Sequence, residues 1–262
     1  MKTIFRIAVI LTALNAGTAA GQSLDDAQRL FYSGRYDGAA AQALHIRTSN
    51  PADLAASELR SSALLFQIKR AIGDVADKDK AWQLCSHCPA LMAEFLAEVA
   101  HGRAAARAAL KGDPADDSAL FFLGKLDLNY VWLHVGTLGK RAGWSEYWEA
   151  RRSLDAVLKR NPTHVRARVA RAWVDYIVAT KVPRGTRWLV GGGNRERGIV
   201  TVYDAANDEG DFFAQTEAQF ALWDMQIRER QFTEALSTAQ ALARDFPDNQ
   251  ELTRFIARHG SR

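Results

Sequence analysis

Apolar residues recur along this chain at intervals of three and four positions, which is the periodicity of an amphipathic α-helix. Ala235, Ala239 and Leu242 show this spacing ahead of Pro247, and residues of similar character stand at the same offsets ahead of three other prolines. These are Pro51, Pro114 and Pro162. The pattern gives no support for strands. It therefore predicts an all-α chain in which proline separates successive units.

The first position of this pattern, twelve residues before the proline, is small in every unit. It is occupied by Ala39, Gly102, Ala150 and Ala235, and by Gly198 in a fifth unit where Gly210 takes the place of proline. Spacings of four and three put the apolar positions on one stripe of a helix. Because a small residue on that stripe lets two antiparallel helices approach closely, we expect one helix pair in each unit.

The pattern resembles the second helix of the tetratricopeptide repeat, in which an aromatic residue stands three positions before the small one. Tyr36, Tyr147 and Phe232 match that aromatic residue, whereas Val99 and Arg195 depart from it. The first helix of the repeat is matched in the third unit by Ala119, Leu120, Leu123 and Gly124. The units here exceed the roughly 34 residues of the standard repeat. The resemblance covers approximately residues 24–258 and is specific only at the level of a superfamily.

The resemblance implies an α-solenoid of about five antiparallel helix pairs with elongated helices and loops, closed by a C-terminal capping helix. The predicted pairs are 24–33 with 37–48, 52–72 with 89–111, 116–135 with 144–160, 163–180 with 194–207, and 211–229 with 232–245, and the capping helix is 248–258. We expect residues 21–262 to form this single tetratricopeptide-like domain.

The first 20 residues have the features of a secretory signal peptide. Lys2 and Arg6 precede an apolar run from Ile7 to Leu14, and small residues follow. The run is shorter than the roughly 20 residues that cross a bilayer. We expect cleavage near Ala19 or Ala20, a periplasmic or secreted protein, and no stable membrane insertion.

Charge and motif content narrow the function classes. The formal net charge is +4, and removal of the leader would lower it by two, which argues against nucleic-acid binding. The six histidines lack a metal-ligand spacing, and the sequence has no recognisable catalytic motif. We therefore expect neither an enzyme nor a cofactor.

The two cysteines form the segment Cys85-Ser86-His87-Cys88, directly ahead of Pro89. A helix N-terminus can lower a thiol pKa, so a redox couple or a thiolate–imidazole metal site is conceivable. The strand–helix context of redox motifs and a second ligand pair are both missing from the sequence. We favour a local disulfide formed in an oxidising compartment.

A glycine-rich segment between the two helices of the fourth unit is a candidate anion or ligand loop. Its candidate residues are Arg184, Arg187, Gly192, Gly193 and Asn194. Glycines that lead into a helix N-terminus beside arginines suit an oxyanion. The favoured alternative is a long turn in which Asn194 caps the helix.

The segment 129–149 is dense in aromatic residues. Trp132, Trp144, Tyr147 and Trp148 could line a pocket, although filling space between helices is the more common role of such side chains.

Five residues are candidates for a binding groove. Phe121, Lys125 and Asn129 recur at a spacing of four in the predicted first helix of the third unit, and Asp224 and Arg228 do so in the fifth. First helices line the concave groove of a solenoid, although an ordinary solvated face would show the same pattern.

The favoured function is thus a periplasmic or secreted scaffold or adaptor that binds a protein or peptide partner in its groove. A small-ligand-binding protein is the alternative, because the helix pairs resemble those of repeat proteins associated with solute transporters. A thiol-redox or metal protein is a minor alternative.

Overall fold

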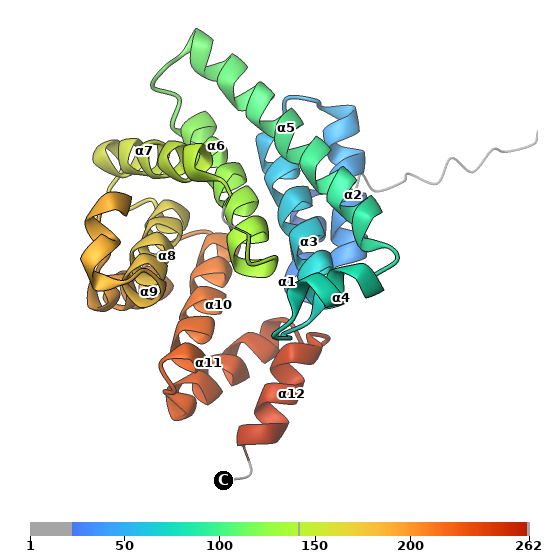
Figure 1. Cartoon of the computed structure of the whole chain (residues 1–262), viewed down its shortest axis with the longest axis vertical. Coiled ribbons are helices and arrows are strands. Elements are labelled where there is room, and N and C mark those ends of the chain that lie inside the picture. The colour runs from blue at the N-terminus through green and yellow to red at the C-terminus, as the bar shows by residue number, and fades with distance from the viewer. Residues whose placement is uncertain (1–22, 141, 261–262) are drawn as a thin grey trace, which may run out of the picture.

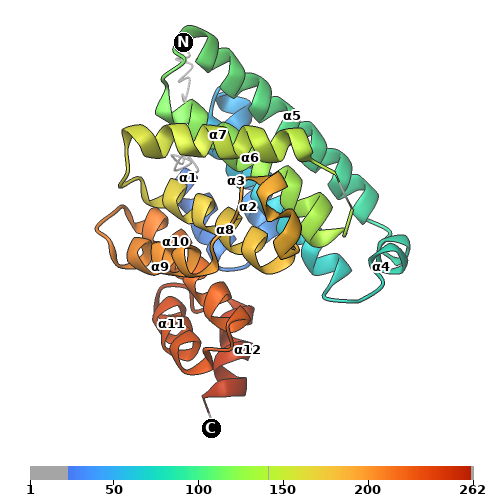
Figure 2. The ribbon, with the colours of Figure 1, turned by 60° about the vertical axis from the view of Figure 1, so that its left-hand side comes forward.

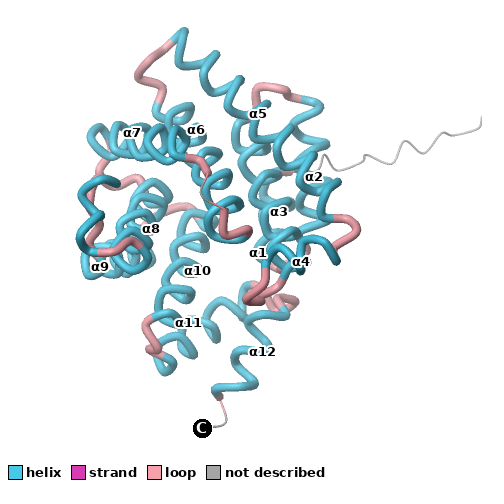
Figure 3. The backbone as a smooth tube through the Cα atoms, in the orientation of Figure 1, coloured by secondary structure: helices cyan, strands magenta, loops and turns pink. Residues whose placement is uncertain are grey.

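The computed structural model describes residues 23–140 and 142–260, and this part of the chain is all-helical, without strands. Its twelve α-helices are α1 (Leu24–Tyr32), α2 (Tyr36–Ser49), α3 (Leu54–Ile72), α4 (Lys78–Leu84), α5 (Cys88–Gly112), α6 (Asp117–Val131), α7 (Trp144–Arg160), α8 (Val165–Lys181), α9 (Arg195–Asn207), α10 (Phe212–Arg228), α11 (Phe232–Asp245) and α12 (Gln250–His259). A π-helical segment, Trp132–Thr137, extends α6, and a 3₁₀ segment, Arg184–Val190, follows α8. Figures 1 and 3 show the arrangement.

The helices pack mainly on their neighbours in sequence. The predicted pairs appear as α1 with α2, α3 with α5, α6 with α7, α8 with α9 and α10 with α11, and α12 packs on α11. Each second helix also contacts the first helix of the next unit. The predicted signal peptide lies outside the described residues.

The small positions of the repeat bring the paired helices together. A Cβ added at Gly102 of α5 would come within 3.1 Å of the Ser57 Cβ on α3, and one at Gly198 of α9 within 2.9 Å of the Ala172 carbonyl oxygen on α8. Ala150 is completely buried against the helix that carries Gly124. The sequence pattern therefore identified the close contacts correctly.

Three elements were not predicted, and one of them is the 3₁₀ segment Arg184–Val190, which lies in the predicted glycine-rich turn. Helix α4 has no buried residue, so no apolar stripe reveals it, and its N-terminus is fixed by the Asp77 carboxylate, which accepts a bond from the Lys80 amide. The π-helical segment after Val131 was read as the end of a single regular helix.

The first helices of the pairs surround the middle of the molecule. In Figure 1, α3, α6, α8 and α10 lie around the centre, with α5, α7 and α9 outside them. The first and last units also meet, because the Tyr32 ring of α1 packs on Phe220 and Phe246, and the Asn249 amide donates to the Tyr32 carbonyl oxygen. Figure 2 shows α11 and α12 at the end of the molecule that carries the C-terminus.

Among the described helices, none combines the length and the apolar character that a membrane span requires.

Candidate functional site

The candidate binding residues lie on one surface, which we call the inner face: the sides of α3, α6, α8 and α10 whose charged side chains meet. Lys125 stands on α6 and Arg166 on α8, and both contact Glu217 of α10. Trp173 lies seven residues after Arg166 on α8, and Asp224 lies seven residues after Glu217 on α10. Seven residues are two helical turns, or about 10 Å, so the inner face has two ends.

One end, which we call the closed end, is a cluster of two acids and two bases. Lys125 Nζ lies 2.5 Å from Glu217 Oε1 and 3.7 Å from Glu58 Oε1. Arg166 bridges the same two acids, with Nε 2.5 Å from Glu217 Oε2 and Nη2 3.0 Å from Glu58 Oε2. The cluster joins four helices from four units, and its formal charges cancel.

Polar and aromatic groups complete the closed end. The Asn129 amide donates to the hydroxyls of Ser61 and Ser62 at 2.9 and 3.0 Å, and Ser62 donates to Glu58 at 2.9 Å. The Arg166 guanidinium lies 5.0 Å from the centre of the Phe121 ring. Phe121 and Asn129 are buried, so both act within this cluster.

The balance of charges sets the protonation states of the closed end. Burial alone would raise the pKa of Glu217, but Arg166 and Lys125 outweigh it and lower that pKa to about 2. Burial alone would lower the pKa of Arg166, and the two carboxylates instead raise it. Burial and the charge of Glu217 raise the pKa of nearby Tyr32 well above its ordinary value. Glu217 and Arg166 are therefore both charged at neutral pH.

The other end of the inner face, which we call the open end, consists of Trp173, Asp224 and Arg228. Arg228 Nε lies 3.1 Å from Asp224 Oδ1, and the guanidinium lies 5.4 Å from the centre of the Trp173 ring. The Asp224 and Arg228 side chains are 43% and 39% exposed, against 14% for Glu217. The open end thus presents a cation and an anion to solvent beside the Trp173 ring, which is itself partly buried against the core.

The structure brings the five predicted groove residues to one face but divides them between its ends. Lys125, Phe121 and Asn129 belong to the closed end, whereas Asp224 and Arg228 belong to the open end. Sequence reasoning missed the partners of these residues, which are Glu58, Arg166, Trp173 and Glu217. Glu217 lies seven residues before Asp224 on the same stripe of α10, so helical spacing could have indicated it. Nothing in the sequence pairs Glu58 with Arg166, which lies 108 positions away.

The glycine-rich loop is held by side chains that donate hydrogen bonds to its carbonyl oxygens. Arg151 donates to the carbonyls of Val190 and Gly191 at 3.0 and 3.1 Å, and to that of Gly192 at 3.3 Å. Gly192 has a φ of +71°, which favours glycine. Gly192 of the predicted anion loop is therefore held by an arginine that the chain itself supplies.

The remaining residues of that loop have local roles or face solvent. Arg187 donates to the carbonyls of Val182 and Ala179, at the end of α8. Asn194 caps α9 through a 2.8 Å bond from the Arg197 amide. Gly193 packs on α8, and Arg184 is exposed.

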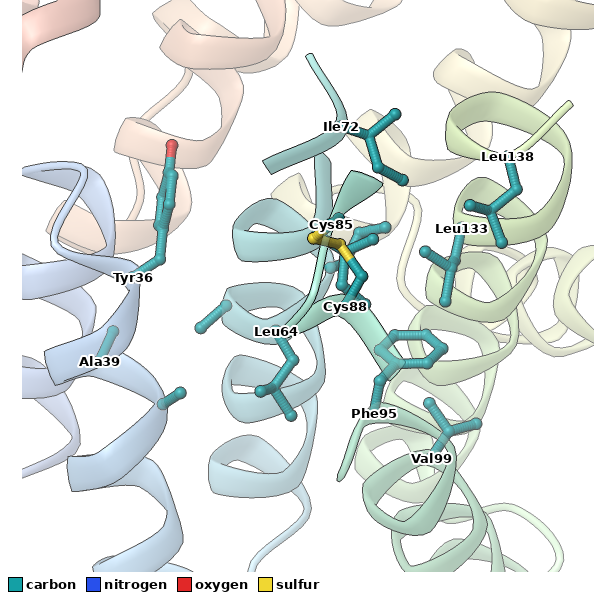
Figure 4. Packing of buried hydrophobic residues seen from close by; sticks show 14 residues of the cluster. Tyr36, Ala39, Leu64, Ile72, Cys85, Cys88, Phe95, Val99, Leu133 and Leu138 are labelled. Carbon is teal, nitrogen blue, oxygen red and sulfur yellow. A yellow bond between two sulfur atoms is a disulfide. The ribbon is translucent and has the colours of Figure 1, made fainter. Parts of the chain in front are cut away.

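Cys85 and Cys88 form a disulfide in the cluster shown in Figure 4, close to Phe95. The sulfur atoms and a ring nitrogen of His87 lie within 4.8 Å of one another. A metal would require thiolates, which the disulfide removes. The pair links the start of α5 to the end of α4.

The aromatic segment does not gather around one hollow. Trp132 packs against the core, Trp144 is exposed, and Tyr147 hydrogen-bonds to the Val190 carbonyl oxygen at 2.8 Å. Two surface hollows of about 270 and 340 Å³ are lined by other residues, including Arg29 in the first and His87 in the second.

A further buried carboxyl lies between α5, α6 and α7. Asp127 is completely buried, and Arg103 Nη2 lies 2.5 Å from its Oδ1. Burial raises its pKa to about 7, because the charge of Arg103 only partly compensates and Glu149 adds to the rise. Unlike the closed end, this site has more acid than base nearby.

The chain matches no known family model, and no curated protein or solved structure matches it either.

Proposed function

We propose that the protein is an exported tetratricopeptide-like adaptor that binds a protein or peptide partner at the open end of its inner face. The observation that carries this proposal is the contrast along α8 and α10: the charges at the closed end are buried among themselves, whereas Asp224 and Arg228 remain substantially exposed. Exposed charge beside an aromatic ring is available to a second molecule.

The chemistry of the open end suits a polypeptide. The Arg228 guanidinium can donate two parallel bonds to a carboxylate, while Asp224 can accept from a backbone or side-chain N–H group. The Trp173 ring offers flat apolar area for a side chain of the partner. Tryptophan and arginine dominate the binding energy of many protein interfaces.

The tetratricopeptide-like solenoid is supported by the consecutive helix pairs and the buried small positions that face them. Export is supported by the leader-like residues 1–20 and by the Cys85–Cys88 disulfide, since disulfides persist in oxidising compartments. An exported adaptor is consistent with the helix-pair architecture and with the signs of export.

A small-ligand function receives less support. Ligand sites bury most of their ligand within a cleft lined by apolar and aromatic side chains. The hollow beside His87 is open and is lined by Gln67, Arg70 and Leu91 rather than by the aromatic segment. We therefore place the partner at the open end.

The test is site-specific photocrosslinking in the protein exported by its own leader. A photoreactive amino acid replaces Thr180 in one variant and Tyr203 in a matched control. Thr180 is exposed on α8 two turns after Trp173, and its replacement leaves Trp173, Asp224 and Arg228 in place. Tyr203 is 57% exposed on α9, away from the inner face. We expect a discrete crosslinked polypeptide from position 180 and not from position 203. Equal crosslinking from both positions, or from neither, would overturn the proposal.

A second measurement uses the captured partner. Trp173→Ala should weaken its binding by about tenfold or more, as expected for an interface hot spot. Circular dichroism of the variant must show unchanged helix content.

A further inference from the structure

The most exposed large apolar pair in the described chain lies outside the inner face, in the 3₁₀ segment Arg184–Val190. Trp188 is 74% exposed and Leu189, the next residue, is 55% exposed. A third exposed aromatic residue, Trp144, stands at the start of α7. Its ring lies 6.1 Å from that of Tyr147, which hydrogen-bonds to Val190. We call Trp144, Trp188 and Leu189 the apolar tip.

The apolar tip is held in place by ordered contacts. Arg151 and Tyr147 bind the carbonyl oxygen of Val190 at 3.0 and 2.8 Å, directly after Leu189. The Trp188 indole donates to the Gly185 carbonyl oxygen at 3.1 Å, and Arg187 donates to carbonyls at the end of α8. These contacts fix the segment, so Trp188 and Leu189 are held in positions where both side chains remain exposed to water.

The surroundings of the apolar tip are basic. No acid occurs between Asp175 and Glu196, whereas Lys181, Arg184, Arg187 and Arg195 lie in that interval. Lys181 and Arg184 are exposed, and neither forms an ion pair with another described residue.

The acids on adjoining elements are engaged elsewhere. Glu146, on the first turn of α7, lies 3.6 Å from Arg103. Asp175 pairs with Arg171 at 2.6 Å and with Arg197 at 2.7 Å. Glu196, on the first turn of α9, is the exposed acid that follows the loop. The positive charge near the tip is thus left uncompensated on the side of Lys181 and Arg184.

We propose that the apolar tip binds the surface of a bilayer that contains anionic phospholipid. Tryptophan is enriched at membrane interfaces, where its ring and its N–H group sit at headgroup depth. Exposed lysine and arginine near the surface are attracted to anionic headgroups. Binding of this kind needs no membrane-spanning helix, since a few apolar side chains enter the interface while the fold stays in water.

The geometry favours a bilayer over a second protein. A stable protein interface generally buries more than about 1,000 Å², shared between the partners and well packed. The tip instead offers Trp188 and Leu189 on a short 3₁₀ segment and Trp144 at the start of α7, with basic residues beside the segment. Such a tip can enter a fluid interface without a complementary surface. This inference does not depend on the proposed adaptor function, because it concerns a different surface.

The test is flotation of the full exported chain with vesicles of equal parts phosphatidylglycerol and phosphatidylcholine, compared with vesicles of phosphatidylcholine alone. We expect the wild-type protein to float with the anionic vesicles, to stay behind with the neutral ones, and to dissociate in high salt. The double variant Trp188→Ala, Leu189→Ala should lose about tenfold or more of its partitioning. Lys181→Gln with Arg184→Gln should weaken binding to anionic vesicles and remove the salt dependence.

The matched control is Tyr203→Ala, which removes an exposed aromatic residue from α9 and should float like the wild type. Circular dichroism of every variant must match that of the wild type. A spectroscopic readout locates the contact: anionic vesicles should shift the tryptophan emission of the wild type to the blue, and Trp188→Phe should lose most of that shift. Absence of wild-type flotation would overturn the proposal, and so would undiminished flotation of the Trp188, Leu189 variant.

Discussion

The closed and open ends of the inner face carry similar residues on the same two helices and differ in their surroundings. At the closed end, Arg166 of α8 meets Glu217 of α10, and Glu58 and Lys125 complete the cluster. Two turns further along, α10 supplies its own pair, Asp224 and Arg228, and α8 supplies only the Trp173 ring. The first arrangement links helices, whereas the second leaves charges facing solvent.

This difference teaches that position on a helical stripe does not decide whether a charge is structural. Breaking a buried pair leaves a desolvated charge without compensation, but an exposed pair contributes little to stability. The closed end differs because two further helices, α3 and α6, add Glu58 and Lys125 to the pair on α8 and α10. These two side chains turn an ordinary helix face into a structural centre. We expect mutations at the two ends to separate stability from binding.

The largest effect is expected from Arg166→Met. It leaves Glu58 and Glu217 facing each other with only Lys125 between them, so the free energy of unfolding should fall by about 3–5 kcal/mol. Urea denaturation followed by circular dichroism measures it. A loss below about 1 kcal/mol would show that the closed end does not hold the four helices together.

Acid titration of stability probes the same end. The folded pKa of Glu217 is about 2, below its usual 4.5, so the folded state releases this proton more readily than the unfolded chain. The resulting stability is present above pH 4.5 and is lost as pH falls toward 2, by about 3 kcal/mol at 1.36 kcal/mol per pKa unit. Glu217→Gln should remove that dependence while lowering stability at pH 7, and an unchanged acid slope would contradict the assigned environment.

Asp127 sharpens the comparison because it is buried without a balanced set of charges. Its folded pKa is about 7, above the usual 3.8, so the folded state holds this proton more tightly and stability falls as pH rises from about 4 to 7. Asp127→Asn should flatten that fall, by about 3 kcal/mol across the interval. Urea unfolding at pH 5 and pH 8 measures it, and identical slopes for variant and wild type would exclude this role of Asp127.

The smallest effect on stability is expected from Arg228→Met at the open end. An exposed i,i+4 pair is worth roughly 0.3–0.5 kcal/mol, so the urea midpoint should scarcely change. A loss above about 2 kcal/mol would mean that the open end is structural as well, and the contrast between the ends would disappear.

The sequence predicted the helix pairs because their apolar stripes and small residues are local signals. The stripe on α6 identified Lys125 and Asn129, and that on α10 identified Asp224 and Arg228, by spacing alone. The stripe did not reveal that Lys125 is enclosed, since its partners Glu58 and Glu217 come from distant units. Helical periodicity predicts which apolar residues are buried. It does not predict the burial of a charged residue, which depends on partners from other units.

The loop and the short helix illustrate the same limit. Asn194 was recognised as a helix cap because capping depends on neighbouring residues. Arg151, which fills the glycine-rich turn from 40 positions away, carries no signal in its own segment. Helix α4 packs on the core only through the partly buried Ala81 and Trp82, which are adjacent in sequence and form no repeating stripe.

The affinity of the Arg228→Met protein for the polypeptide captured by crosslinking from position 180 tests the central claim most directly, measured at a temperature where the variant is fully folded. If the open end binds the partner through the Arg228 guanidinium, the affinity should fall by about tenfold or more while the free energy of unfolding stays within about 0.5 kcal/mol of the wild type. An affinity equal to that of the wild type would contradict the assignment of the open end as the binding site.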